Sequence, residues 1–139
     1  MLQKGYLVRT ERGLRTTMDF LGDTVFYDPT NPEARDFVWN TVKENYYDTG
    51  IHMFWLDVAE PEYPVYDFEN YRYHLGPNVR IGNIYPLMYA KTFYDGMKQE
   101  GQDNIINLLR CAWGRQPTLR RAGLVGGYRF QFRIPEKPV

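Results

Sequence analysis

Residues 51–57 read Ile-His-Met-Phe-Trp-Leu-Asp, a short and nearly continuous apolar run that follows Gly50 and ends in an acid. An apolar run of this length is typical of a strand covered on both faces of a parallel sheet. Residues 105–109, Ile-Ile-Asn-Leu-Leu, repeat the pattern and are followed by Arg110. We therefore predict two buried strands, with Asp57 and Arg110 at their carboxyl ends.

Two helices are predicted beside these strands. Thr30 or Asn31 can cap the first, Pro32 fits its first turn, and Glu33 can close a capping box. The helix is predicted to stop near Gly50, and its predicted inner face is Ala34, Phe37, Val38, Thr41, Val42 and Asn45 or Tyr46. The second helix is predicted from about residue 83 to Gly101, with an inner face of Leu87, Ala90, Tyr94 and Met97.

A third short strand is predicted over residues 24–28, which end in Asp28. The resulting order, β-α-β-α-β, predicts an α/β fold with a parallel sheet. Ligands bind such sheets at the carboxyl ends of the strands, so we expect Asp28, Asp57 and Arg110 to share one edge. A complete (β/α)₈ barrel takes roughly 250 residues, so these strands are part of a barrel at most.

Composition excludes several classes of protein. The 139 residues are 43% hydrophobic and 24% charged, as in a globular chain. No secretory signal and no apolar run of about 20 residues is visible, which favours the cytoplasm. One cysteine, Cys111, cannot form an internal disulfide, and two histidines provide no metal-ligand cluster. We therefore expect no metal ion and no cofactor.

Several other side chains could take part in chemistry. Asp57 beside a cation could stay ionised as a nucleophile, although an ion-paired or capping role fits its position better. Glu60 and Glu62 are interpreted as loop acids, with Glu62 simply solvated. His52 is predicted to be a core or helix-facing residue, and His74 a loop residue. Most aromatic residues of the loop over residues 58–82 are expected to pack, and one or two to touch a ligand: Tyr63, Tyr66, Phe68, Tyr71 and Tyr73.

Three motifs, in order, resemble glycoside hydrolase family 31, the retaining α-glucosidases and α-xylosidases. Residues 55–61, Trp-Leu-Asp-Val-Ala-Glu-Pro, resemble the nucleophile motif Trp-x-Asp-x-x-Glu-Pro of this family. Residues 27–32 resemble its Pro-Asp-Phe-Thr-Asn-Pro element. Residues 83–86 and 108–113 resemble its next helix start and its strand with the active-site arginine. The resemblance covers residues 1–113 and implies part of a catalytic (β/α)₈ TIM barrel.

The resemblance implies a role for each matching residue. Asp57 would be the nucleophile, Arg110 would contact substrate and nucleophile, and Trp55 would form a wall of the sugar pocket. Phe20 stands where many members have a tryptophan, and Glu60 and Asp28 would support the site. The implied substrate is an α-linked glycoside or oligosaccharide, and no nucleic acid or membrane would be bound. The family's acid/base aspartate lies in a Trp-Ser/Thr-Gly-Asp motif, whereas residues 114–139 contain no aspartate.

Residues 114–139 carry six basic residues against one acid, so the remainder of the chain is acidic. Shifting the reading frame of codons chosen for Ala122 to Tyr128 gives Ala-Leu-Val-Trp-Ser-Gly-Asp, the missing motif. We therefore predict that residues 114–139 are an out-of-frame translation after Trp113, and that the chain alone is inactive. An alternative is a genuine amphipathic strand, because Tyr128 and Phe130 alternate with basic residues.

Two other functions remain open at this point. A catalytically inactive relative could bind carbohydrate through Trp55, Arg110 and the tyrosines of the loop. An interaction module could use the basic tail to bind nucleic acid or an anionic surface.

Overall fold

The computed structural model describes residues 1–14, 16–19, 23–59, 68–110, 122–125 and 128–130. Two long helices dominate, α1 (Pro32–Asn45) and α3 (Tyr85–Gln99). The other helical segments are η1 (Leu2–Lys4), η2 (Tyr47–Thr49), η3 (Phe68–Asn70), α2 (Asn78–Ile81) and η4 (Gly82–Ile84). The strands are β1 (Arg9–Thr10), β2 (Met18–Asp19), β3 (Asp23–Thr24), β4 (Phe54–Leu56), β5 (Tyr71–Tyr73), β6 (Gly76–Pro77), β7 (Asn107–Leu109), β8 (Ala122–Val125) and β9 (Tyr128–Phe130).

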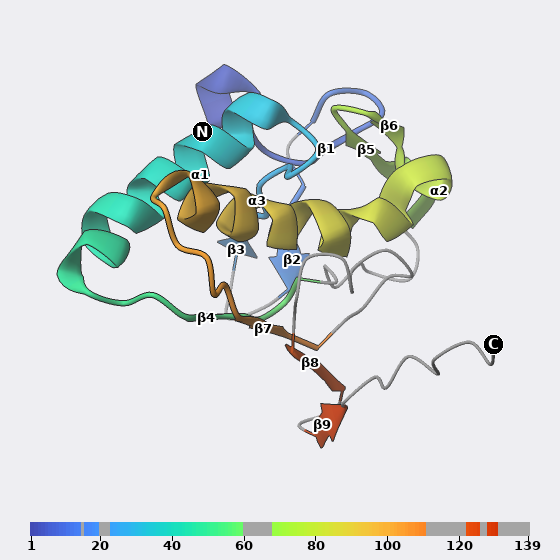
Figure 1. Ribbon diagram of the computed structural model, residues 1–139. Helices are drawn as coiled ribbons and strands as arrows, with labels where there is room; N and C mark the ends of the chain where they lie inside the picture. The colour runs from blue at the N-terminus through green and yellow to red at the C-terminus, as the bar shows by residue number, and fades with distance from the viewer. Residues whose placement is uncertain (15, 20–22, 60–67, 111–121, 126–127, 131–139) are drawn as a thin grey trace, which may run out of the picture.

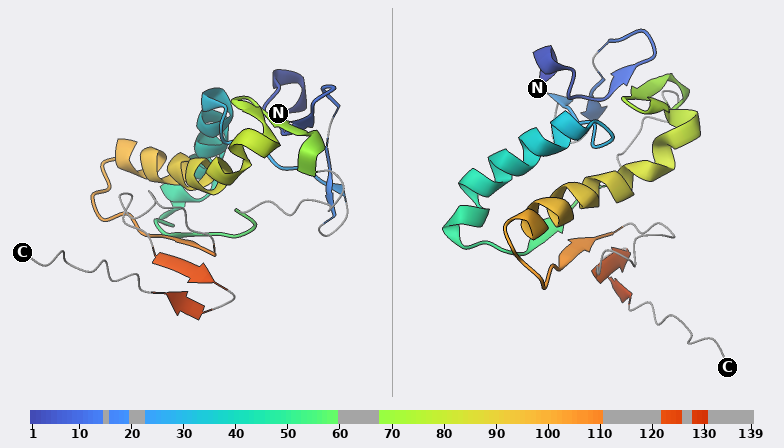
Figure 2. Two further views of the ribbon diagram at one scale, coloured as in Figure 1. Left: turned by 90° about the vertical axis from the view of Figure 1, so that its right-hand side faces the viewer. Right: turned by 45° about the horizontal axis from the view of Figure 1, so that its top comes forward.

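The largest sheet has the strand order β4-β7-β8-β9. β4 and β7 are parallel, β7 and β8 are parallel, and β9 returns antiparallel to β8. Helices α1 and α3 lie side by side on one face of this sheet (Figures 1 and 2). The described residues thus form an open two-layer α/β arrangement, as predicted for a partial barrel, and they do not close a barrel.

The register of β4 against β7 fixes which side chains are neighbours. Phe54 pairs with Asn107, Trp55 with Leu108, and Leu56 with Leu109. Leu56 and Leu109 are 3% and 1% exposed and point toward the helices. Because side chains alternate along a strand, Trp55 points away from the helices and is 64% exposed. The prediction of a strand covered on both faces is therefore wrong for β4 in this chain.

Helix α1 begins where its sequence predicts. Asn31 is the N-cap, and its side chain accepts a hydrogen bond from the Glu33 amide at 3.0 Å. The Glu33 carboxylate accepts a bond from the Tyr6 hydroxyl at 3.2 Å, a contact outside the predicted capping box. The predicted inner face is partly wrong, because Trp39 is buried whereas Phe37 is 37% exposed.

Trp39 is buried because its ring packs against Gly96 of α3, which has no side chain. It belongs to a core cluster between helices and sheet, which comprises Trp39, Tyr47, Leu56, Ala59, Ala90, Phe93, Met97, Ile105 and Leu109. A Cβ atom added at Gly96 would lie 2.0 Å from Trp39 Cδ2 and 2.3 Å from its Cε2. The indole ring of Trp39 thus occupies the space that any side chain at position 96 would need.

Gly96→Ala is expected to destabilise the chain by about 1–3 kcal/mol, because the indole or the helices must move. Alanine is intrinsically better than glycine in a helix by about 1 kcal/mol, which offsets only part of this cost. Urea unfolding followed by circular dichroism measures the change. Trp39→Leu in the Gly96→Ala background should recover part of the loss, and strictly additive effects of the two changes would contradict this packing.

The predicted strand over residues 24–28 is not part of the parallel sheet. Its first residue lies in β3, which pairs antiparallel with β2, and Tyr27 forms an isolated antiparallel bridge with Leu7. Phe26 instead packs in a second cluster with Val8, Tyr71, Tyr73 and Tyr85. A short alternating segment fits an irregular antiparallel contact as well as a parallel strand, which is why its pattern misleads.

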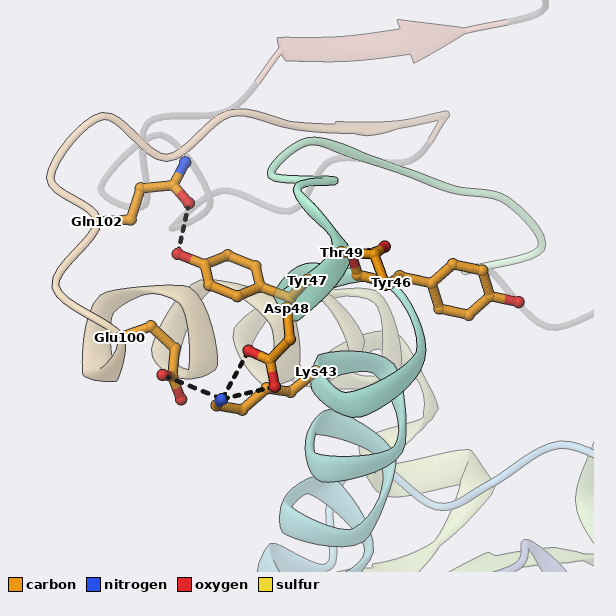
Figure 3. Close-up of polar contacts among 7 residues, drawn as sticks. All are labelled: Lys43, Tyr46, Tyr47, Asp48, Thr49, Glu100 and Gln102. Carbon is orange, nitrogen blue, oxygen red and sulfur yellow. Dashed lines mark hydrogen bonds and ion pairs between the residues drawn. The ribbon is translucent and has the colours of Figure 1, made fainter.

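Polar contacts tie the end of α1 to the segment that follows α3 (Figure 3). Lys43 Nζ lies 2.7 Å from Asp48 Oδ1 and 3.5 Å from Glu100 Oε2. The Tyr47 hydroxyl donates to Gln102 Oε1 at 3.1 Å, and Gln102 Nε2 donates to the His52 carbonyl at 3.2 Å. These bonds hold together the two segments that lead into β4 and β7.

The segment predicted as a long loop contains regular structure where it is described. β5 and β6 form a hairpin that also pairs with β1, and α2 and η4 connect it to α3. Tyr71 and Tyr73 are 2% and 1% exposed, which confirms that they pack, whereas Phe68 is 42% exposed. None of the helices in the described ranges is long and apolar enough to cross a membrane.

Candidate functional site

Asp57 and Arg110 meet at the carboxyl ends of β4 and β7. Each residue directly follows its strand, and the register that pairs Leu56 with Leu109 places Asp57 beside Arg110. Arg110 Nε lies 3.3 Å from Asp57 Oδ1, so the predicted proximity of the two charges is confirmed. Their side chains are 37% and 47% exposed, respectively, so both groups are partly accessible to solvent in this chain.

The backbone after Asp57 turns sharply. Asp57 Oδ1 also accepts a hydrogen bond from the Val58 amide at 2.9 Å. Val58 has a φ of 51°, and it is the one non-glycine residue with a positive φ in the described part of the chain. Its side chain packs against the second core cluster, while Ala59 is fully buried in the first. The chain therefore packs against the core again directly after Asp57, at Val58 and Ala59.

Tyrosine rings lie below this edge. Tyr89 packs against both core clusters and stacks on Phe93, with ring centroids 5.9 Å apart. Burial raises the pKa of Tyr89, and the negative charge of Asp57 adds to this rise. Tyr27, whose ring centroid lies 5.3 Å from that of Tyr89, donates its hydroxyl to Thr92 Oγ1 at 3.1 Å. Burial raises the pKa of Tyr27 strongly.

These shifts predict loss of stability in alkali. The pKa of Lys43 is also raised, because its ammonium group donates to Asp48. Raised pKa values mean that above about pH 10 the folded chain binds more protons than the unfolded chain. Stability should be unaffected by these groups below about pH 10 and should fall above it. Urea unfolding measured from about pH 8 to about pH 11.5, a range that brackets the reference pKa values of Tyr and Lys, tests this.

Tyr27→Phe should flatten the decline, because its hydroxyl can then no longer ionise in the unfolded chain. Tyr46→Phe is the matched control, since Tyr46 is 53% exposed, and it should leave the profile as it is in the native chain. An alkaline decline equally steep in the native chain and in Tyr27→Phe would contradict the assignment.

Asp28 is separate from the Asp57–Arg110 edge and is only 3% exposed. Its Oδ1 accepts bonds from the Thr30 amide at 2.9 Å and the Thr30 hydroxyl at 2.6 Å. Its Oδ2 accepts a bond from the His74 amide. The expectation that Asp28 shares the edge with Asp57 is therefore wrong, because its segment is not a strand of that sheet and both oxygens bind the backbone around them.

The other residues predicted for the site lie on β4, beside it, in the β5–β6 turn or outside the described ranges. Trp55 lies on β4 two residues before Asp57, so both side chains are on the face away from the helices. His52 is exposed, so a core position is wrong, but its ring packs against Tyr47 of η2 with centroids 4.3 Å apart and the planes tilted by 31°. His74 lies in the turn between β5 and β6, as predicted. Phe20, Glu60, Glu62, Tyr63, Tyr66 and Cys111 fall outside the described residues.

Neither a metal site nor the cavity of the described chain includes Asp57 or Arg110. No group of three or more His, Cys, Asp or Glu side chains in the described ranges is placed to hold a metal ion. An open cavity of about 490 Å³ lies between the β1 turn and β5, where its lining includes Glu11, Arg12 and Thr16 but neither Asp57 nor Arg110.

The sequence signal for Val58 and Tyr89 was weak. A valine gives no indication of a left-handed backbone, which favours glycine or asparagine. Tyr89 lies in a helical pattern in which many residues are aromatic, so its closeness to Asp57 depends on the packing of α3 against β4.

The model of the glycosyl hydrolase family 31 TIM-barrel domain matches residues 1–133. An uncharacterized family 31 glucosidase, ORF2, of Pseudescherichia vulneris is 57% identical over 113 residues, covering 81% of this chain and 21% of that protein. An α-xylosidase of Saccharolobus solfataricus is 34% identical over 104 residues, covering 69% of this chain and 14% of that protein.

The crystal structure of an α-xylosidase from a soil metagenome, complexed with xylose, superposes with a TM-score of 0.81. It is 59% identical, and the match covers 87% of this chain and 18% of that one. The chain thus spans about a fifth or less of the curated relatives it matches. Since the family model covers nearly all of these residues, the chain belongs to glycosyl hydrolase family 31 and carries part of its TIM-barrel domain.

Proposed function

We propose that this chain is part of a retaining α-glycosidase in which Asp57 is the nucleophile. The observation that carries the proposal is the placement of the Asp57 carboxylate 3.3 Å from the Arg110 guanidinium, at the carboxyl edge of a parallel sheet. The matched protein of Saccharolobus solfataricus is an α-xylosidase, which supports an α-linked xyloside or glucoside as the substrate.

In this proposal, one Asp57 oxygen attacks the anomeric carbon as the bond to the leaving oxygen breaks. The product is a covalent glycosyl-enzyme, which water then hydrolyses with net retention. Arg110 pairs with the carboxylate and touches the sugar, and Trp55 offers its exposed ring as a wall of the sugar pocket. Phe20 and Glu60 are proposed to complete the surroundings, while Asp28 supports the fold beneath them.

The second carboxylate must protonate the leaving oxygen and later activate water, and it sits about 5–5.5 Å from the nucleophile in retaining enzymes. Residues 114–139 contain no aspartate and one glutamate, Glu136. We propose that these residues are read out of frame after Trp113 and that the in-frame segment supplies the acid/base aspartate.

Two matches bear on this boundary. The 57% identical match extends over 113 residues, the same length as residues 1–113. The family model reaches residue 133, and β8, at residues 122–125, continues the parallel sheet beside β7. The first finding favours a boundary at Trp113, whereas the second favours a genuine continuation of the sheet after it.

The nucleotide sequence after the Trp113 codon tests the frame directly. A one-base change there should restore a Trp-Ser-Gly-Asp motif, and its absence would reject the out-of-frame proposal.

Activity is tested with the protein translated from the restored reading frame, called here the in-frame enzyme. It should hydrolyse an aryl α-xyloside or aryl α-glucoside with retention of configuration, and NMR identifies the anomer that is released first. The 139-residue chain should show no turnover. Turnover by that chain, abolished in Asp57→Ala, would contradict the need for an in-frame aspartate.

A carbohydrate-binding role is the second candidate, because Trp55 exposes an aromatic ring beside Asp57 and Arg110. Isothermal calorimetry with xylose, glucose and their α-aryl glycosides separates the two candidates. Binding without turnover by the in-frame protein would favour this role, and turnover would reject it.

A further inference from the structure

The hydrogen bonds of Asp57 are unevenly divided between its two carboxylate oxygens. Oδ1 accepts from the Val58 amide at 2.9 Å and lies 3.3 Å from Arg110 Nε. Oδ2 accepts no hydrogen bond from any residue in the described ranges. The carboxylate is therefore fixed through one oxygen, and the other is available to a ligand.

The residue that carries this amide has a left-handed backbone, since Val58 has a φ of 51°. For a β-branched residue this conformation is a genuine outlier, since its Cβ substituents crowd the backbone. Such conformations persist only where the surrounding structure holds them, and they concentrate at functional sites.

Packing on both sides of the turn holds this conformation. The Val58 side chain packs against the core cluster that contains Tyr73 and Tyr85. Ala59 is fully buried in the other cluster, beside Leu56 and Leu109. The two anchors hold the backbone directly after the peptide whose N–H donates to Asp57 Oδ1.

We infer that Val58 is a positioning residue for Asp57, fixing Oδ1 toward Arg110 and leaving Oδ2 as the oxygen that attacks the substrate. The inference rests on the proposed function of Asp57. It assigns the two oxygens different tasks, and it makes a half-buried valine responsible for the orientation of a carboxylate that is itself 47% exposed. An exposed carboxylate without such a bond would rotate about its side-chain torsions.

Amide hydrogen exchange, measured by NMR on the 139-residue chain, tests the inference without any need for turnover. The Val58 amide should be protected in the native chain. Asp57→Ala removes the acceptor and should speed its exchange about tenfold, as expected for a bond to a charged group. Val58→Gly removes the side-chain anchor and should speed exchange of the residue 58 amide to a similar extent, whereas Val58→Ile should preserve protection.

The Thr30 amide, which donates to Asp28, is the internal control and should stay protected in all variants. Native protection of the residue 58 amide in Val58→Gly would overturn the inference. Loss of Thr30 protection in Val58→Gly would also overturn it, since Val58 would then support the whole fold. If the proposed glycosidase activity fails while these exchange patterns hold, the fault lies in the function and not in the positioning.

Discussion

In the in-frame enzyme, Asp57→Ala is expected to lower kcat/KM for an aryl α-xyloside by at least about a thousandfold. The alanine cannot form the glycosyl-enzyme, so the two-step route is lost. Arg110 would at the same time lose the carboxylate that lies 3.3 Å from its Nε. Steady-state kinetics with the purified enzyme measures the loss.

The control must separate lost chemistry from lost folding. Asp103→Ala removes an exposed carboxylate just before β7 and should leave kcat/KM unchanged. Sodium formate, whose carboxylate can enter the space left by Asp57→Ala, should restore part of the turnover. Activity of Asp57→Ala within tenfold of the native enzyme would reject Asp57 as the nucleophile, since such a loss is only about 1.4 kcal/mol.

Asp28→Ala is expected to destabilise the 139-residue chain by about 3 kcal/mol, because three donors lose a buried acceptor. The donors are the amide and hydroxyl of Thr30 and the amide of His74. The bond to His74 joins the start of α1 to the turn between β5 and β6, 46 residues away. A loss of this size is a large part of the total stability of a small domain.

Urea unfolding measures this loss, with Asp95→Ala as the matched control. Asp95 pairs with Lys91 on the surface of α3, so its removal should change stability by less than about 1 kcal/mol. Asp28→Asn should fall between the two, because an amide presents one oxygen and its nitrogen would face a donor. Equal stability of Asp28→Ala and Asp95→Ala would contradict the role assigned to the Asp28 network.

Local chemistry made part of the fold predictable from sequence. Asn31 and Pro32 mark the start of α1 because capping depends on neighbouring residues. The approach of Asp57 to Arg110 follows from two parallel strands that each end in a charged residue. Both inferences need only short-range patterns and one rule of sheet geometry.

Non-local packing made the remainder unpredictable. Phe37 and Trp39 are both apolar residues of one helix, and the choice of Trp39 for the core depends on Gly96 of another helix. Asp28 depends on the His74 amide, which no local pattern links to it. The left-handed turn at Val58 contradicts the preference of its own residue type, so only the surrounding core explains it.

The pairing of Leu56 with Leu109 has a consequence for how errors at the site would arise. A slip of β7 by one residue would turn Arg110 to the opposite face of the sheet and would bring Leu109 level with Asp57. The same slip would expose a leucine that is now 1% exposed, so the hydrophobic effect opposes it. Burial of Leu56 and Leu109 on the inner face of the sheet thus maintains the strand register that sets the spacing of the charged groups on the outer face. A conservative change at either leucine can therefore alter the distance between Asp57 and Arg110 without altering those two residues.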